Sequence, residues 1–550
     1  MIPGLRDTIG AYLLTVQLTP EEEECFWQAF LRIEGDMTPI ALPKSLAPIS
    51  LQECQQRLAH LNERTARRKK DGVYYTDEDL TEYMVFNAFN CFVSDDVDNV
   101  SDVTSLRNKF SGSTSATIER LLRASTFDPT CGAGEFLVSA VKFKCELLFA
   151  SKNLFSDKDL AKLLSTVYGN DIERSSVVIT QIRLILELFS KLKDKKNIHL
   201  LERALHGHFT VEDYVTNIRK RHLRYDIMLG NPPYVEYTKL PAIPKGNFGN
   251  SYADVLNNVT HELKSAGAIA FVVPLSYVST PRMNSIRQIF ITEFKKQFVL
   301  SFADRPDCLF VSAHQKLCIV FASRKSTKET CGFYTSTYHY WYKSERNSLF
   351  DSLSVQKNEF VSQIGVPKIG NNIELQLHQK THIGGRDLLS CLSSRGDTVP
   401  LYLNMRGCFW MKAFSAPPTS SEYKMFSVRK DEYGYIMCIL NSSLYFSQWI
   451  ALSDCWHITR KELDTFSVPE ITRQQKEMFG ELAIRLENKL EDTKVYIGSK
   501  QVDYEYKHKL CKDVIDEIDT ALKPVYNLND EEVKYVKSFK LKYRLSNDEQ

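Results

Sequence analysis

The stretch from Tyr225 to Tyr234, YDIMLGNPPY, holds the side chains of this sequence best suited to chemistry. Its apolar first half predicts a buried strand, and the two prolines, which cannot donate ladder hydrogen bonds, predict that the strand ends in a rigid loop. In that loop the Asn231 side-chain oxygen and the Pro232 carbonyl can accept both hydrogens of a planar primary amine. Pro233 stiffens the turn, and the ring of Tyr234 can stack on the plane that carries the amine. A strand-terminating turn without a ligand is the alternative interpretation.

A glycine-rich turn lies upstream, in the sequence STFDPTCGAGEFL that ends at Leu137. Its pattern predicts a strand, a turn that contains Asp128 and Cys131, and then an apolar helix. Gly132 and Gly134 would let the backbone approach a ligand closely, and the start of the helix offers free N–H groups. A third glycine and a Lys-Ser/Thr pair are missing, so the turn is neither a dinucleotide fingerprint nor a phosphate-binding loop. These residues favour a nucleoside ligand without a phosphate chain.

Acidic residues end the next two predicted strands. Asp171 closes the run VYGND, and a carboxylate at such a strand end is placed to accept hydrogen bonds from ribose hydroxyls. Asp213 follows the next run, FTVED, shortly before the central stretch. Acids at three successive strand ends, followed by the amide-and-proline loop, form an ordered series. The series supports a functional interpretation more strongly than any one of its members.

The composition excludes some classes of protein and leaves others open. A chain of 550 residues is too long for one core, and its 43% hydrophobic and 25% charged residues are ordinary for a globular protein. We find neither an apolar run of about 18 residues, which a membrane span needs, nor a basic segment followed by an apolar one at the start. The 13 cysteines lack a Cys-x-x-Cys pair, which argues against a zinc ribbon and fits a reducing cytoplasm. A net charge of +2 does not decide nucleic-acid binding, because binding needs a basic face and not a basic average.

Three regions differ in their patterns. Residues 1–70 predict helices, and Thr19-Pro20-Glu21 predicts a helix start, with threonine as the cap, proline in the first turn and acids at the positive end of the dipole. Residues 71–325 alternate strands with helices, which predicts an α/β fold. Beyond 325 the strands shorten and aromatic and Ser/Thr residues increase, so we place a boundary there. The tail of the third region, 326–550, returns to helices, at 473–493 and 514–522.

Three local expectations concern the middle region. Thr76 can cap the predicted helix over 80–89, with Asp79 as its box-like partner. The Asp-, Ser- and Thr-rich segment 92–118 predicts a loop or an insert. The runs 308–310 and 317–321 predict a closing hairpin.

In this order the motifs resemble the gamma-class N6-adenine DNA methyltransferases of the Taq type, which are type II modification methylases with a C-terminal target recognition domain. The resemblance is dense over 71–325, where it includes the N-terminal motif Gly72–Thr76, and looser at 439–446, 456–461 and 526–532. It implies an N-terminal helical extension, a class I Rossmann-like S-adenosylmethionine-dependent catalytic domain and a mixed α+β recognition domain with a helical tail, at 1–70, 71–325 and 326–550. The sequence departs from the pattern at Asp128 and Cys131, where the motif varies, and in the insert.

The resemblance also implies which residues bind S-adenosylmethionine. Thr76 would lie near its methionine carboxylate, Asp171 would hold the ribose hydroxyls and Ile172 would pack on its adenine. Asp213 would accept a hydrogen bond from the amine of that adenine. The turn residues Asp128, Cys131, Gly132 and Gly134 would line the same site.

The implied substrate is an adenine flipped out of double-stranded DNA, because its amine is otherwise buried in base pairing. Asn231, Pro232, Pro233 and Tyr234 would grip and stack on it. Phe310 would flank it, although a core phenylalanine is an equal alternative at that place. No set of metal ligands is visible in the sequence.

Other functions stay open at this point. One is methylation of another amine, on RNA bases or a protein glutamine amide; another is a non-catalytic DNA-binding protein on the same fold. A bifunctional restriction–modification polypeptide would need a nuclease domain, for which 1–70 is short. The resemblance implies a cytoplasmic, nucleoid-associated protein and leaves open whether a companion restriction endonuclease recognises the same site. Candidate DNA contacts are Arg406, Lys412, Arg460 and Lys461.

Overall fold

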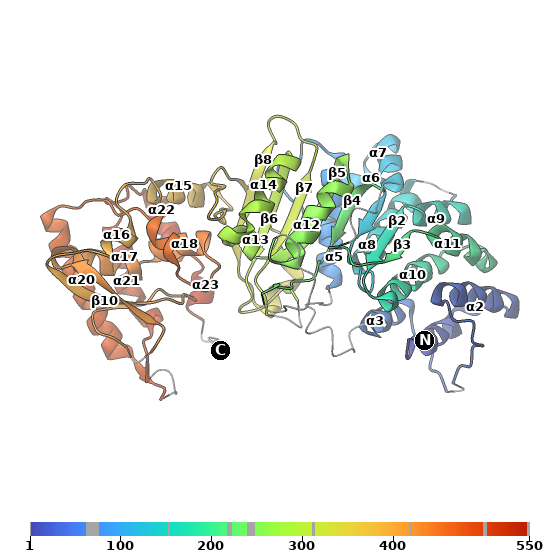
Figure 1. Cartoon of the computed structure of the whole chain (residues 1–550), viewed down its shortest axis with the longest axis horizontal. Coiled ribbons are helices and arrows are strands. Elements are labelled where there is room, and N and C mark those ends of the chain that lie inside the picture. The colour runs from blue at the N-terminus through green and yellow to red at the C-terminus, as the bar shows by residue number, and fades with distance from the viewer. Residues whose placement is uncertain are drawn as a thin grey trace.

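The computed structural model of the chain describes residues 2–43, 45–61, 76–151, 154–216, 223–238, 248–310, 314–418, 420–498 and 503–546. The motif residues Gly72 to Tyr75 lie outside these ranges. Figure 1 shows three parts along the long axis, with N-terminal helices at one end, a large sheet in the centre and a C-terminal part at the other end. Within the described ranges, no helix combines the length and the apolar character that crossing a membrane requires.

A nine-stranded, mostly parallel sheet forms the centre. The strand order is β3-β2-β1-β4-β5-β7-β6-β8-β9; the first five strands and the β6–β8 pair are parallel, and β7 runs antiparallel to β5 and β6. This mixed α/β architecture confirms the predicted fold class. The strand bounds are β1 Thr126–Asp128, β2 Val167–Asp171, β3 Phe209–Val211, β4 Tyr225–Gly230, β5 Leu263–Pro274, β6 Lys296–Phe302, β7 Leu317–Ser323, β8 Gly332–His339 and β9 Gln356–Lys357.

Helices cover both faces of the sheet. Figure 1 shows α12 and α14 in front of it and α5 behind it. The helix α10 is buried along nearly its whole length because its run VVITQIRLILELF is apolar on most sides. The bounds are α5 Glu78–Val93, α6 Val103–Ser111, α7 Ser115–Arg123, α8 Glu135–Ser151, α9 Asp157–Leu164, α10 Arg174–Phe189, α11 Ile198–Leu205, α12 Ser251–Glu262, α13 Ser276–Ser279 and α14 Asn284–Glu293.

The strand order places the two main motifs side by side. The chain winds from β1 outward to β2 and β3 and then returns to β4 on the other side of β1. Parallel strands end at the same edge of a sheet, and ligands bind at the point where the winding direction reverses. The glycine-rich turn after β1 and the Asn-Pro-Pro-Tyr loop after β4 therefore meet at this reversal point.

The N-terminal helices are α1 Leu5–Val16, α2 Pro20–Glu34 and α3 Leu51–Leu61. The predicted helix start is confirmed: Thr19 Oγ1 accepts from the Glu22 amide at 3.3 Å, and the Glu22 carboxylate accepts from the Thr19 amide at 2.8 Å. This reciprocal pair satisfies two donors that a helix start leaves open.

The segment 92–118 is not a continuous loop, so that part of the prediction is wrong, whereas its interpretation as an insert stays a prediction. It contains α6 and the start of α7, and its polar residues are helix caps: Asp102 accepts from the Ser105 amide at 2.8 Å, and Thr114 accepts from the Thr117 amide at 3.3 Å. Asp, Ser and Thr favour both loops and helix N-caps, so composition alone does not distinguish the two.

Two further local expectations need correction. Asp77, and not Thr76, is the N-cap residue of α5, because Thr76 is buried and its hydroxyl accepts from another side chain. The hairpin consists of β6 and β7, whereas 308–310 lies in the segment between them.

The composition change near 325 marks the end of β7 and not the end of the sheet, because β8 and β9 continue it. The C-terminal part is built on the largely buried helices α17 and α18 and on the three-stranded sheet β11-β10-β12. Its elements are β10 Thr398–Asn404, β11 Ala413–Phe414, β12 Tyr423–Arg429, β13 Val495–Tyr496, β14 Tyr504–Glu505, α15 Asn372–Thr381, α16 Leu388–Cys391, α17 Tyr433–Asn441, α18 Ser443–Leu452, α19 Arg460–Asp464, α20 Arg473–Thr493, α21 Lys512–Ala521, α22 Asp530–Ser538 and α23 Leu541–Arg544.

Candidate functional site

The turn between β1 and α8 lies close against α10 at Gly134 and is open at Gly132. A Cβ on Gly134 would lie 2.7 Å from Thr180 Cγ2, so glycine lets the turn lie against α10. A Cβ on Gly132 would meet nothing within 4 Å, and the residue has a φ of +54°. The Cys131 side chain is buried and receives a hydrogen bond from Thr180 Oγ1 at 3.8 Å. The turn is thus packed on one side and open beside Gly132, where a ligand has room.

Asp171, at the end of β2, fastens this turn. Its carboxylate accepts from the Gly132 amide and from the Glu173 amide, both at 2.9 Å. The next residue, Ile172, is 66% exposed. An exposed apolar side chain beside an open turn and a carboxylate fits the ring and the sugar of a nucleoside.

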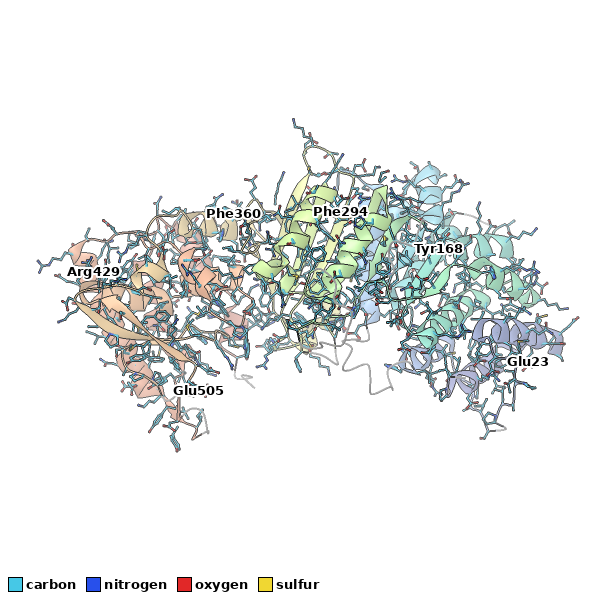
Figure 2. The ribbon with its side chains drawn as sticks, viewed as in Figure 1. Glu23, Tyr168, Phe294, Phe360, Arg429 and Glu505 are labelled. Atoms are coloured by element: carbon cyan, nitrogen blue, oxygen red, sulfur yellow. The ribbon has the colours of Figure 1, made fainter. Side chains whose placement is uncertain are left out.

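Asn170 is a site residue that the sequence analysis did not single out. Tyr168, which Figure 2 labels, marks strand β2 in the sheet, and Asn170 lies two residues further on. Its buried side chain donates to the Pro129 carbonyl at 2.9 Å and to the Glu212 carbonyl at 3.0 Å, and it accepts from Thr210 Oγ1 at 2.7 Å. It therefore joins the segments that follow β1 and β3. A buried polar residue directly before a strand-end acid is the signal that could have identified it.

Asp213 lies beyond β3 and is held by its own turn. Its carboxylate accepts from the Val215 amide and from Thr216 Oγ1, each at 2.9 Å. The preceding amide, of Glu212, donates to the Asp171 carbonyl at 3.1 Å. One edge of the sheet thus carries Asp128 and Asp171, which end β1 and β2, and Asp213, which follows β3, as their order in the sequence predicts.

The Asn-Pro-Pro-Tyr loop begins against Asp128. A Cβ on Gly230, the last residue of β4, would lie 2.6 Å from Asp128 Oδ1, so only glycine fits here. The Asp128 carboxylate is buried and accepts from the Thr130 amide at 3.0 Å. Burial, opposed by that hydrogen bond and aided by the negative charge of Asp171, raises the pKa of Asp128 well above its usual value.

Hydrogen bonds orient the side chains of the loop. Asn231 Nδ2 donates to Thr76 Oγ1 at 3.3 Å, so Oδ1 is the end of the amide that accepts. The Tyr234 hydroxyl has two acceptors within reach, Asn231 Oδ1 and, at 3.0 Å, the Val272 carbonyl. The Thr76 hydroxyl is therefore joined to the loop although 155 residues separate it from Asn231.

The first residue of α12 secures the far end of the loop. Ser251 Oγ donates to the Pro233 carbonyl and accepts from the Val235 amide at 2.9 Å. Proline has no amide hydrogen, so the backbone of the loop has no hydrogen-bond donor at Pro232 or Pro233. The serine supplies this link.

Arg346 is a second residue that the sequence analysis missed, because it lies beyond the expected boundary near 325. Its guanidinium grips the Asp79 carboxylate with contacts of 2.6 and 2.8 Å and donates to the Leu309 carbonyl at 3.1 Å. It also lies 3.4 Å from Asp77, whose pKa burial raises to about 6 although the nearby guanidinium lowers it. Arg346 therefore joins the start of α5, just after Thr76, to the segment that holds Phe310.

Two candidate site residues lie mostly inside the protein, namely Phe310 and Lys461, whose side chain is 11% exposed. Phe310 is fully buried, which agrees with the core alternative, and its stacking role stays a prediction. The Lys461 ammonium donates to the carbonyls of Ser279 and, at 3.0 Å, Leu452, so this lysine ties the C-terminal part to α13. Arg406 and Arg460 are exposed and form ion pairs with Glu422 and Asp464, and Lys412 is half-buried. The described residues contain no group of three or more His, Cys, Asp or Glu placed to hold a metal ion.

The sheet order, the glycine turn with its partner acid and the Asn-Pro-Pro-Tyr loop belong to a mixed α/β protein with one large, mostly parallel sheet. Residues 165–308 match the family model of the Eco57I restriction-modification methylase. The match includes Asp171, Asp213 and the whole loop from Asn231 to Tyr234, and it implies S-adenosylmethionine as the cofactor. No curated protein matches the chain in sequence.

A solved structure of a restriction–modification enzyme has a similar fold, and two further solved structures match less closely. The Type IIL enzyme MmeI, in a complex with DNA, has a TM-score of 0.53 at 13% identity over 88% of this chain and 81% of that one. The DrdV–DNA complex has a TM-score of 0.41 at 15% identity, over 57% and 33% of the two chains. A nuclease-deletion mutant of the Type ISP enzyme LlaGI, with a DNA substrate mimic, has a TM-score of 0.44 at 12% identity, over 80% and 48%. This chain spans less than half of the length of the DrdV and LlaGI chains.

Proposed function

We propose that this protein is a site-specific DNA methyltransferase that transfers a methyl group from S-adenosylmethionine to N6 of an adenine flipped out of duplex DNA, as the modification arm of a restriction–modification system. The observation that carries the proposal is the Asn-Pro-Pro-Tyr loop beside the glycine turn at the reversal point of the sheet, inside a segment that matches a restriction-modification methylase family. DNA appears in the solved complexes of MmeI, DrdV and LlaGI, which supports DNA as the substrate class.

The residues of the turn fit the cofactor. The open face beside Gly132 and the exposed Ile172 would receive its nucleoside, with Asp171 at the ribose. Asp213 would accept from its adenine amine, and Thr76 would lie near its carboxylate end. Asp128, Cys131 and Gly134 would line the same site. When bound there, S-adenosylmethionine supplies an electrophilic methyl group.

The loop would hold the amine that receives the methyl group. Asn231 Oδ1 and the Pro232 carbonyl would accept its two hydrogens, and this weakens the conjugation of the nitrogen lone pair with the ring. In the structure the Tyr234 hydroxyl contacts Asn231 Oδ1, and the Val272 carbonyl is its alternative acceptor. A bound amine can therefore replace the Tyr234 hydroxyl at Asn231 without leaving that hydroxyl unpaired, while the tyrosine ring stacks on the base. Most of the catalytic effect would come from orientation.

Transfer of label from radioactive S-adenosylmethionine to mixed-sequence duplex DNA tests the proposal. Wild type, Asn231→Ala and the control Asn108→Ala, at an exposed position on α6, would be assayed beside tRNA and protein extract as rival acceptors. We expect label on N6 of adenine for wild type and the control, and a loss of at least about 100-fold for Asn231→Ala. Label only on RNA or protein would refute DNA as the substrate, and unchanged labelling by Asn231→Ala would refute the role of the loop.

A further inference from the structure

The N-terminal helices contact the body of the molecule directly behind the glycine turn. Gln55, on α3, is buried against Arg183, on α10. The two residues exchange hydrogen bonds: Arg183 Nε donates to Gln55 Oε1, and Gln55 Nε2 donates to the Arg183 carbonyl, both at 2.9 Å. This pairing uses both ends of the Gln55 amide and one edge of the guanidinium, so each residue fixes the other's orientation.

The other edge of the Arg183 guanidinium holds the turn itself. Nη1 donates to the Ala133 carbonyl at 2.7 Å and to the Glu135 carboxylate at 2.6 Å, and Nη2 donates to the same carboxylate at 3.0 Å. Ala133 lies between the two glycines of the turn, and Glu135 is the first residue of α8. Only 4% of the Arg183 surface is exposed, so its charge depends on these partners for compensation.

A second contact reaches the other cofactor segment. Arg174, the first residue of α10, follows Asp171 and Ile172 closely in the chain. Its Nη2 lies 3.4 Å from the Glu34 carbonyl at the end of α2, and a Cβ on Gly35 would lie 2.6 Å from it. The Glu34 carboxylate in turn forms a buried ion pair with Arg6 of α1 at 2.7 Å.

We propose that the N-terminal helices position the cofactor site, with Gln55 and Arg183 as positioning residues for the glycine turn. The inference rests on the proposed cofactor role of that turn. The helical sequence pattern of α1, α2 and α3 alone did not indicate this role. The hydrogen bonds that orient the Asn-Pro-Pro-Tyr loop run to Thr76, Val272 and Ser251 and not to Gln55 or Arg183, so a disturbance at Gln55 should act first on the glycine turn.

The test compares two contacts between the N-terminal helices and the body. Gln55→Met keeps the side-chain volume and removes both hydrogen bonds to Arg183. The control is Arg32→Met: Arg32, on α2, contacts Glu202, on α11, at 2.8 and 2.9 Å, and this ion pair includes neither a residue of the glycine turn nor Arg174. Gln55→Glu keeps the acceptor for Arg183 Nε and is the conservative variant. Titration calorimetry with S-adenosylhomocysteine gives the dissociation constant, and methylation of DNA gives KM for S-adenosylmethionine and kcat.

We expect Gln55→Met to weaken S-adenosylhomocysteine binding by about tenfold and to raise KM for S-adenosylmethionine similarly, with kcat within about twofold of wild type. Gln55→Glu should restore most of the affinity, and Arg32→Met should bind like wild type. Unchanged binding by Gln55→Met, or an equal loss in Arg32→Met, would overturn the positioning role. If Gln55→Met does not fold, Glu135→Gln, which weakens the same guanidinium contact, should show the same rise in KM without a change in kcat. A wild type that binds no S-adenosylhomocysteine would refute the proposed function instead.

Discussion

Replacing Arg346 by methionine should loosen the start of α5 in a pH-dependent manner. The guanidinium, 18% exposed, forms contacts with Asp79, with Asp77 and with the Leu309 carbonyl. Removing one partner of a fully buried ion pair costs about 3–5 kcal/mol. The side chains of Asp79 and Asp77 are 39% and 25% exposed, so water compensates part of the loss, and we expect about 1–3 kcal/mol.

The pH dependence follows from Asp77. Its pKa is raised by burial to about 6 in the folded protein, against an ordinary value of 3.8. Because the pKa is raised in the folded protein, Asp77 contributes to stability when the pH is below its ordinary pKa. This contribution is lost as the pH rises from about 4 through 6. In the wild type the positive charge of Arg346 lowers the pKa of Asp77 and so limits this loss of stability. Without Arg346 the pKa should rise further, so the destabilisation by Arg346→Met should be larger at pH 8 than at pH 5.

Hydrogen exchange of the α5 amides, measured at pH 5 and pH 8 and corrected for the intrinsic rates, reports the local opening free energy. The matched control is Arg107→Met: Arg107 also joins two acids, Glu82 at 2.6 Å and Glu146 at 2.9 Å, but it is 43% exposed. The control should lose less than about 1 kcal/mol at either pH. Equal losses in the two variants, or a loss for Arg346→Met that does not grow with pH, would refute the reasoning.

Three further predictions concern the site. Gly230→Ala should destabilise the protein by about 1–3 kcal/mol, because its Cβ would overlap Asp128 Oδ1; urea unfolding measures this, and an unchanged midpoint would contradict it. Asn170→Leu should cost about 1–3 kcal/mol, since it leaves the buried Pro129 and Glu212 carbonyls without a donor, and it should weaken S-adenosylhomocysteine binding in calorimetry; wild-type affinity would argue against its role. Tyr234→Phe should keep a measurable methylation rate, whereas Tyr234→Ala should lose it. Stacking needs the ring, while the hydroxyl donates to Asn231 Oδ1 or to the Val272 carbonyl and would not contact the base. Equal methylation rates for the two variants would contradict stacking.

The sequence predicted the fold class and the order of the site motifs because both depend on local signals. Strand ends carry their acids and glycines next to them in the chain, and the α/β alternation requires a mostly parallel sheet whose strand ends meet at one edge. For that reason Asp171 and the turn at Gly132 were expected together, and the structure joins them by a hydrogen bond. The capped start of α2 was also predictable, since all its partners lie within one helical turn.

The residues that fasten the site could not be predicted in the same way. Asn231 and Thr76 are separated by 155 residues, Arg183 and Gln55 by 128, and Arg346 and Asp79 by 267. A single sequence does not reveal such pairs, because they follow no helix or strand periodicity and many polar residues could form them. The incorrect prediction of a loop over 92–118 has another cause: the same residue types cap helices and form loops.

The long-range contacts fall into two groups with different targets. On the cofactor side, Gln55 and Arg183 fix the turn between β1 and α8. On the side of the amine-binding loop, Arg346 fixes the start of α5, whose neighbour Thr76 holds the Asn231 amide. Methyl transfer needs the two ligands in line, and small errors in alignment cost rate steeply. Because Gln55 and Arg346 act on different members of the two proposed ligand-binding loops, we expect separable defects: a raised KM for the cofactor from Gln55→Met and a lowered kcat from Arg346→Met.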